Sequence, residues 1–265
     1  MARVDTLGHF LTDVADAIRT KKGSSDTIQA SSFDTEITNL PSGGGADLNE
    51  YFYAEITQNT DSTNNMKDKT VKKLADVIVA DTVTSLAYAY SGSNGTNTLG
   101  LLPKVICNNN VTALNHMYFN INNVANIDLS GINASNVTTM ANMFRLNSPN
   151  TALKTINFGS NFNTNKVENM SYLFYGCRGL NSLDMSSCET SSLTSVRNMF
   201  YDCRGLSFLD IRKMTFTNVN DSGSMLQNVP TTCEIIVKSQ TEKTWFNTNF
   251  SSYTNVKTVA EYESE

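Results

Sequence analysis

The feature that most constrains the fold is an internal repeat with a period of about 26 to 30 residues. Residues 173–180 read LFYGCRGL and residues 199–206 read MFYDCRGL, and a Leu-Asp pair follows each of them three residues later. Partial copies of the same motif occur at Leu86–Tyr90, Leu114–Tyr118, Met140–Phe144 and Met225–Leu226. Because self-similarity at a fixed period is typical of units that pack only against their neighbours, we expect a solenoid.

Each repeat has two apolar parts with different spacing. In the first, apolar and polar residues alternate, as in 127–129 (IDL) and 183–185 (LDM), which predicts a short strand with one buried face. In the second, apolar residues follow an i, i+3, i+4, i+7 spacing, which predicts one face of a short helix, as in Met170, Leu173, Phe174 and Cys177. The sequence therefore predicts an α/β repeat solenoid, leucine-rich-repeat-like, with short parallel strands and short helices, preceded by a small N-terminal helical unit.

The chain divides into four segments. We expect residues 1–40 to form an N-terminal helical attachment segment, since apolar residues recur there at helical spacing, and residues 41–50 to be a glycine-rich linker. Residues 51–237 are predicted to be the solenoid with its N-terminal cap, and residues 238–265 the C-terminal cap. Caps are needed because the end coils of a solenoid have only one neighbour.

Composition excludes several partners and locations. A net charge of −5 leaves no positive excess for a phosphate backbone, so nucleic acid is not expected as a partner. Residues 1–22 lack the apolar stretch of a signal peptide, and no window is apolar enough to span a membrane. Charged residues are only 17% of the chain, whereas Asn, Ser and Thr make up about a third. We expect these polar residues mainly in the turns that join the parts of each coil.

Candidate catalytic and metal-binding residues are scarce. The five cysteines form no C-x-x-C pair, which predicts buried free thiols rather than disulfides or a zinc site. The only histidines are His9 and His116, and we expect surface or packing roles for both. No hydrolase, nucleotide-binding or metalloprotease motif occurs. We therefore expect a protein that is not an enzyme and has no cofactor or metal.

Two rows of side chains at equivalent repeat positions are candidate binding surfaces. The strand row lies on the outward positions of the predicted strands and consists of Asp128, Asn157, Asp184 and Asp210. Stacked like charges repel unless a cation, an Asn or a ligand intervenes, so the row either holds a hydroxyl-rich sugar or is a solvated face. The turn row consists of Tyr175, Arg178, Tyr201 and Arg204. It suits stacking on carbohydrate or contact with a protein, or else the tyrosines pack on each other while the arginines cap helix ends.

Two parts of the chain resemble known families. Residues 127–144 (IDLSGINASNVTTMANMF) resemble the repeat of the bacterial-surface-antigen-like leucine-rich repeat proteins, although the cysteine that follows the Met-x-x-Met-Phe motif there is missing after Phe144. Residues 7–40, with VADAIRTKKG at 14–23, resemble a segment found in tail, baseplate and fibre proteins of phages and prophages of Gram-positive bacteria.

The combined resemblance implies a non-enzymatic phage structural protein of the tail, baseplate or fibre. Its N-terminus would dock on the virion through an apolar helix face made of Leu7, Phe10, Leu11, Val14 and Ile18. The solenoid would contact host cell-wall polysaccharide, a host surface protein or other virion proteins, with no membrane partner. A homo-oligomer located in the virion, and made in the host bacterial cytoplasm, is expected. The alternative is a bacterial surface adhesin or interaction module of the same repeat family.

Overall fold

The computed structural model describes residues 54–56, 58–63, 77–92, 102–147, 152–160 and 162–265. The predicted attachment segment, linker and docking residues lie outside this part of the chain. The described elements, in chain order, are β1 (Ala54–Ile56), β2 (Val77–Val79), β3 (Val105–Ile106), β4 (Asn126–Asp128), β5 (Thr155–Asn157), β6 (Ser182–Asp184), β7 (Phe208–Asp210), β8 (Glu234–Val237), α4 (Gln240–Asn249), β9 (Val256–Thr258) and α5 (Val259–Tyr262).

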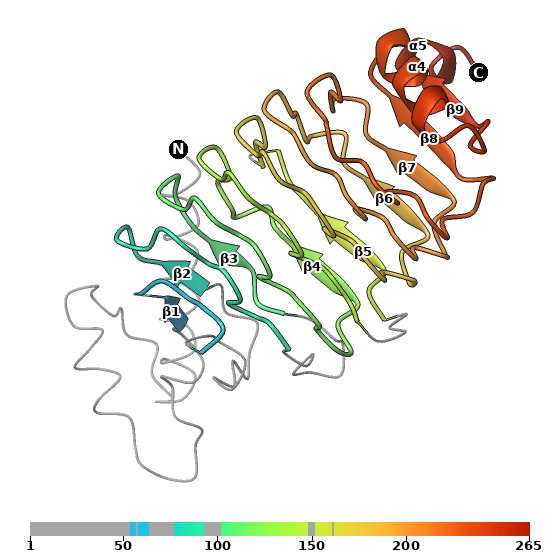
Figure 1. Ribbon diagram of the computed structural model, residues 1–265. Coiled ribbons are helices and arrows are strands. Elements are labelled where there is room, and N and C mark those ends of the chain that lie inside the picture. Colours follow the sequence, from blue (N-terminus) through green and yellow to red (C-terminus); the bar gives the residue numbers. More distant parts are fainter. Residues whose placement is uncertain (1–53, 57, 64–76, 93–101, 148–151, 161) are drawn as a thin grey trace, which may run out of the picture. The chain divides into compact units, whose positions relative to one another are not determined.

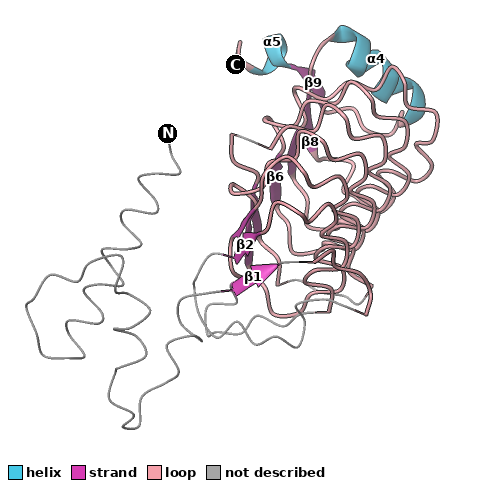
Figure 2. Cartoon of the chain, turned by 90° about the vertical axis from the view of Figure 1, so that its left-hand side faces the viewer, coloured by secondary structure: helices cyan, strands magenta, loops and turns pink. Residues whose placement is uncertain are grey.

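The described residues from Ala54 onward form a parallel-strand solenoid, as the repeat predicts. Figure 1 shows the coils stacked one after another, and Figure 2 shows the strands aligned along the stack. The strands form three parallel sheets, in the orders β1-β2-β3, β4-β5 and β6-β7-β8-β9. The pairing keeps the repeats in register, with Asp128 opposite Asn157 and Asp184 opposite Asp210. The inward positions of the predicted strands are confirmed, because Ile127, Ile156, Leu183 and Leu209 are all buried.

The segments predicted as short helices are turns instead, so the helical part of the α/β prediction is wrong for the described coils. In each of six successive coils the first turn is closed by a hydrogen bond of type i+3 to i, such as Met143 N–H to the Met140 carbonyl at 3.1 Å. The third residue of each turn has a positive φ of 53° to 60°, which is the left-handed conformation of a type II turn. These residues are Tyr88, His116, Asn142, Tyr172, Asn198 and Ser224.

Backbone hydrogen bonds between coils explain why a helix does not form. An α-helix directs every N–H group to a carbonyl four residues earlier in the same segment. Here alternate N–H groups donate to the next coil: Phe144 donates to the Leu173 carbonyl at 2.9 Å, and Phe174 donates to the Met199 carbonyl at 2.8 Å. The same apolar spacing therefore occurs in consecutive turns. Their buried residues face the core, and their backbone is hydrogen-bonded to the neighbouring coil.

The core contains a column of stacked rings that runs through five coils. Tyr90, Tyr118, Phe144, Phe174 and Phe200 are buried, and each ring stacks on the next at 5.4 to 5.5 Å between centroids and within 10° of parallel. Offset stacking of this kind is favourable beyond the area that it buries. The hydroxyls of Tyr90 and Tyr118 are buried and have no hydrogen-bond partner among the described residues. The first two rings of the column thus carry polar groups that the later coils replace with Phe.

Short polar side chains pair with the backbone at the corners of the coils, as composition predicts. Asn133, Asn163 and Asn169 each accept a hydrogen bond from the N–H group two residues later, at 2.8 to 3.1 Å. Thr112 and Thr194 donate from Oγ1 to carbonyls of the preceding coil. These bonds satisfy backbone groups at the bends, where strand pairing stops.

All five cysteines are free and buried, as expected. The Sγ atoms of Cys177 and Cys203 donate to the carbonyls of Phe144 and Phe174 in the preceding coils, at 3.2 and 3.1 Å. Burial raises the pKa of Cys107 to about 11 and the pKa values of Cys188 and Cys233 to about 12. The thiols are therefore protonated at neutral pH and act as small apolar residues.

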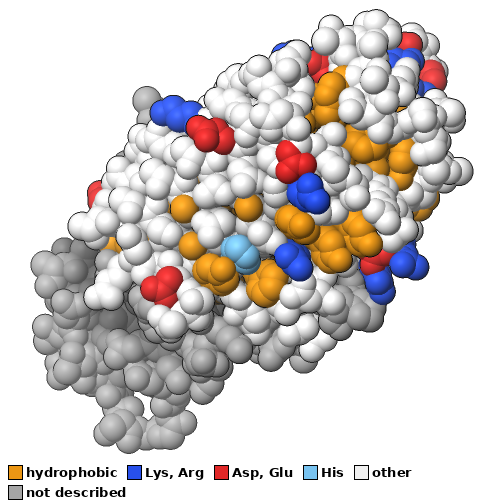
Figure 3. Space-filling model, viewed as in Figure 1, with side chains coloured by type: hydrophobic (Ala, Val, Ile, Leu, Met, Phe, Trp, Pro, Cys, Tyr) orange, Lys and Arg blue, Asp and Glu red, His pale blue; other side chains and the backbone are white. Residues whose placement is uncertain are grey.

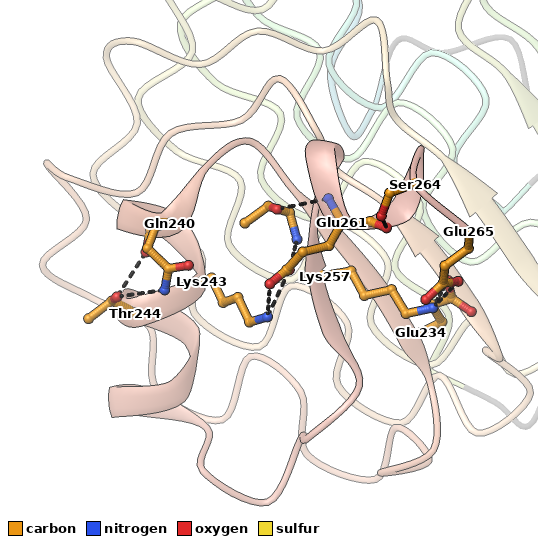
Figure 4. Close-up of polar contacts among 9 residues, drawn as sticks. Glu234, Gln240, Lys243, Thr244, Lys257, Glu261, Ser264 and Glu265 are labelled. Atoms are coloured by element: carbon orange, nitrogen blue, oxygen red, sulfur yellow. Dashed lines mark hydrogen bonds and ion pairs between the residues drawn. The ribbon is translucent and has the colours of Figure 1, made fainter.

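Residues 238–265 pack on the last coil. Helix α4 begins after Ser239, whose Oγ accepts from the Thr241 N–H at 3.2 Å, and it buries Phe246 against Phe216. Figure 4 shows ion pairs that hold α5 and the C-terminus to this region, including Lys243 with Glu261 at 2.7 Å. Within the described residues, no helix has the length and hydrophobicity needed to cross a bilayer.

Removing the buried hydroxyl of Tyr118 should stabilise the protein. Tyr118→Phe keeps the stacked ring, as at Phe144, and removes a buried polar group that lacks a partner, so the free energy of unfolding should rise by about 1 kcal/mol. Urea unfolding measures this change. Tyr253→Phe is the matched control, because the Tyr253 hydroxyl donates to the carbonyls of Leu226 at 2.5 Å and Val229 at 2.9 Å. That variant should be destabilised, and a loss of stability in both variants would contradict the expectation.

Candidate binding surface

The strand row is built into the corners of the coils. Each of its four side chains accepts, through Oδ1, a hydrogen bond from the N–H group two residues later in the chain. The N–O distances are 2.9 Å at Asp128, 3.1 Å at Asn157, 2.8 Å at Asp184 and 3.1 Å at Asp210. This is an Asx turn, which Asp and Asn form readily after a strand. The row thus has a structural role that needs no ligand.

Like charges along the strand row are separated or neutralised. Asn157 donates to Asp128 at 3.0 Å, and Arg212 pairs with Asp210 at 2.7 Å. Burial alone would raise the pKa of Asp128, but hydrogen bonds from Ser130 and the charge of Lys104 lower it overall. The expectation that all four side chains point outward is wrong for Asp210, which is only 4% exposed. Its carboxylate is covered because Arg212 folds over it.

The turn row brings its four residues together in two kinds of contact. The rings of Tyr175 and Tyr201 stack at 4.7 Å and within 4° of parallel. Arg178 and Arg204 both pair with Asp202, the first through Nε at 2.7 Å and the second through Nε at 2.5 Å. The tyrosines therefore pack on each other between coils. The arginines pair with Asp202 rather than capping helices, because these described segments are turns.

Tyr175 and Tyr201 belong to a longer surface, which we call the aromatic ribbon. It consists of Tyr88, His116, Phe119, Arg145, Tyr172, Tyr175 and Tyr201, all half-buried and all in the turn segments of five successive coils. Figure 3 shows hydrophobic side chains gathered in a band on this side of the molecule, with a histidine and basic side chains among them. The ribbon is a set of side-chain contacts that spans these five coils on the described surface.

Contacts within the aromatic ribbon are continuous from one end to the other. Tyr88 stacks on His116 at 4.4 Å, and His116 meets Phe119 edge to face at 5.3 Å. The Arg145 guanidinium then lies 6.0 Å from the ring centre of Phe119 and 5.0 Å from those of both Tyr172 and Tyr175. Arg145 thus bridges the two aromatic groups through cation–π contacts.

Electrostatics along the ribbon are set by arginines. Hydrogen bonds from Arg145 to Asn147 at 2.9 Å and to Asn142 at 3.1 Å fix its guanidinium. Burial and then the charge of Arg145 lower the pKa of His116, so this ring is neutral at pH 7. Among the described residues Arg145 has no carboxylate partner within ion-pair distance, unlike Arg178 and Arg204.

Sequence reasoning found two members of the ribbon and missed five. A signal was present: Phe119, Arg145, Tyr175 and Tyr201 share one repeat position, and Tyr88, His116 and Tyr172 share another three residues earlier. The missed residues differ in type between coils, so the pattern becomes visible only when the repeats are aligned by position. No group of His, Cys, Asp and Glu that could hold a metal ion occurs among the residues that the structure covers.

Asp202 should make a measurable, pH-dependent contribution to stability. Burial alone would raise its pKa, but hydrogen bonds and charges from Arg204 and Arg178 lower it overall. Because the folded pKa is depressed, the contribution is complete above the ordinary Asp value of about 3.9 and is lost as the pH falls through the folded value. Asp202→Asn, which suits the positive φ of 62° at this position, should lower the free energy of unfolding at pH 7 by about 1 to 3 kcal/mol.

In the Asp202→Asn variant the free energy of unfolding should also fall less steeply as the pH is lowered, as measured by urea unfolding between about pH 3 and pH 7. Asp184→Asn is the control, because Asp184 is exposed and its Asx turn can be kept by Asn. Equal effects of the two substitutions at pH 7 would show that the arginine pairs contribute nothing.

Comparison with known proteins gives one match. A family model described as "Mycoplasma protein of unknown function, DUF285" matches residues 112–239. Searches of curated proteins and of solved structures found no match. The matched span is slightly less than half of the chain, and it begins just before Leu114 and ends just after β8. The similarity therefore covers the solenoid coils that carry the ribbon from His116 to Tyr201.

Proposed function

We propose that the protein is a non-enzymatic attachment protein whose aromatic ribbon contacts a macromolecule outside the chain. The observation that carries this proposal is the continuity of the ribbon over five coils, with half-exposed aromatic side chains and an arginine, Arg145, that has no carboxylate partner among the described residues. Tyr and Arg are enriched at the centres of binding interfaces, since they combine contact area with hydrogen-bonding groups. Contiguous exposed apolar surface on an otherwise polar protein also marks interaction sites.

The rigidity of the ribbon supports the same role. Each ring is fixed by a neighbouring ring, and Arg145 is fixed by Asn142 and Asn147, so little side-chain freedom remains to be lost on binding. A solenoid also presents equivalent positions at regular spacing, which suits an extended partner. The strand row is a weaker candidate for a binding surface, because its Oδ1 atoms already accept hydrogen bonds from backbone N–H groups at the corners of the coils.

We further propose that the protein is a structural component of a phage tail, baseplate or fibre. It rests on the resemblance of residues 7–40 to phage and prophage proteins and of residues 127–144 to bacterial-surface-antigen-like leucine-rich repeats. In this proposal residues 1–40 dock on the virion, the protein is a homo-oligomer, and the solenoid meets a host-surface molecule or another virion protein. The proposed location is the virion, assembled in the cytoplasm of the host bacterium.

A second candidate is a bacterial surface adhesin or interaction module. It is favoured by the family match over residues 112–239, since that family is described as a Mycoplasma protein. The two candidates share the ribbon and differ in what the N-terminal segment attaches to.

Cell binding tests the role of the ribbon. Fluorescently labelled full-length protein is incubated with a panel of bacterial strains, and the bound fluorescence is measured. Tyr175→Ala with Tyr201→Ala should lower binding at least about tenfold on every strain that the wild type binds, because hot-spot aromatics are worth about 2 kcal/mol or more each. The control replaces by Ala two exposed residues, Lys154, which precedes β5, and Ser182, the first residue of β6. If the tyrosine variant has the same thermal unfolding temperature as the control and binds cells like the wild type, the ribbon is not the attachment surface.

Incorporation into particles tests the docking role of the N-terminal segment. Leu11→Asp with Val14→Asp places two charges on the predicted apolar helix face, which should prevent docking because a buried unpaired charge is costly. Purified particles should then lack the protein, as measured by immunoblotting, whereas Thr12→Asp on the polar face should be incorporated normally. Normal incorporation of the double variant would exclude virion docking through this face.

A further inference from the structure

The aromatic ribbon has little ring-face area available for a ligand. Tyr88 with His116 and Tyr175 with Tyr201 stack at 4.4 and 4.7 Å and within 8° of parallel, so the facing sides of these rings cover each other. Sugars that stack on aromatic residues use these faces. A half-buried stacked pair instead offers ring edges and phenolic hydroxyls to the outside. The ligand must therefore suit edges and hydroxyls.

The edges and hydroxyls of the ribbon favour negative charge. An aromatic ring carries partial positive charge at its edge, and a phenol can donate a hydrogen bond. The hydroxyls of Tyr88, Tyr175 and Tyr201 have no hydrogen-bond partner among the described residues, so they are available as donors. Exposed polar groups of this kind are hydrated in the free protein and can exchange water for ligand oxygen atoms.

Formal charge adds to this preference. Four arginines belong to the ribbon or lie beside it: Arg178 and Arg204 pair with Asp202, Arg197 pairs with Asp221, and Arg145 has no carboxylate partner among the described residues. The ion pairs of these four arginines thus involve only two carboxylates among the described residues, on a chain whose net charge is −5. Arg145 lies in the middle coil, and its planar guanidinium is fixed by two asparagines and two tyrosines. A fixed guanidinium binds carboxylate or phosphate through paired hydrogen bonds.

We propose that the aromatic ribbon binds an anionic glycan, a linear polysaccharide that bears carboxylate or phosphate groups, with Arg145 as its main anion contact. This inference rests on the proposed function and names the ligand class of the same surface. The ribbon supplies a side chain from each of five successive coils, and a polymer of similar repeat length can meet them in turn. Sugar hydroxyls pair with the tyrosine hydroxyls and with neighbouring amides, and the acidic group pairs with Arg145.

Direct binding to defined polymers tests this proposal with the full-length protein. The probes in biolayer interferometry are polygalacturonate, which carries carboxylates, a phosphomannan, which carries phosphates, neutral dextran, and poly-L-glutamate. At least one anionic glycan should bind, more weakly as salt rises, because screening weakens charge contacts. Dextran should not bind. The stronger of the two anionic glycans identifies which acidic group the ribbon prefers.

Substitutions localise the binding. Arg145→Gln should weaken binding of the preferred glycan about tenfold or more, the effect of one hydrogen bond to a charged group. Arg145→Lys keeps the charge but not the planar fork and should give an intermediate loss. Tyr175→Phe with Tyr201→Phe keeps the stacked rings and removes two hydroxyls, so binding should fall while thermal unfolding is unchanged. Lys154→Gln, which removes the same charge from an exposed site beside β5, should bind like the wild type.

Several outcomes would overturn the inference. Equal binding of dextran would exclude an anionic ligand class, and tighter binding of poly-L-glutamate than of either glycan would indicate an acidic protein partner. Binding to no polymer, or an equal loss in Arg145→Gln and Lys154→Gln, would exclude the assigned anion contact. If the tyrosine variants lose cell binding while polymer binding is absent, the ribbon is still the attachment surface and only the ligand class is wrong.

Discussion

Hydrogen bonds between the turn segments of neighbouring coils are the constraint on which the rest of the structure depends. Each coil sends alternate N–H groups to the carbonyls of the next coil, as from Asn142 to Ser171 at 2.9 Å. This pairing requires one left-handed residue per coil at the same position, which costs a non-glycine residue about 1 to 2 kcal/mol. The cost is offset because the turn closes, the backbone is paired without a helix, and a buried apolar row forms.

The same backbone arrangement places rings on two parallel columns. Residues such as Phe144 and Phe174 point into the core and stack at 5.4 Å, and residues such as Tyr175 and Tyr201 lie on the surface and stack at 4.7 Å. Both columns follow from the translation between coils, since a side chain at a fixed repeat position meets its equivalent in the next coil. The aromatic ribbon is therefore an outcome of the repeat geometry, combined with the choice of aromatic residues at exposed positions.

The strands, their register and the buried thiols could be predicted from sequence because each depends on one residue pattern. The alternation at 127–129 predicts a strand with one buried face. Asp184 and Asp210 hold the same position in successive repeats, which predicts that they pair across the sheet. The turns could not be predicted this way, because Met170, Leu173, Phe174 and Cys177 have the same spacing on a helix face as on a row of turns. What decides between them is the backbone pairing with the next coil, which no single repeat contains. Asp210 was misplaced for a similar reason, since its burial depends on Arg212.

Stability alone explains most of the ribbon but not Arg145. Tyrosines at surface positions stack, and arginines beside Asp202 form ion pairs that hold two coils together, so each has a structural reason to be present. At the repeat position of Arg145 the neighbouring coils have Phe119 and Tyr175, either of which would continue the stack without a charge. An arginine there interrupts the stacking of one ring on the next. Asn142 and Asn147 accept hydrogen bonds that orient it, and it has no carboxylate partner among the described residues. In our proposal this oriented cation is the contact for an anionic partner.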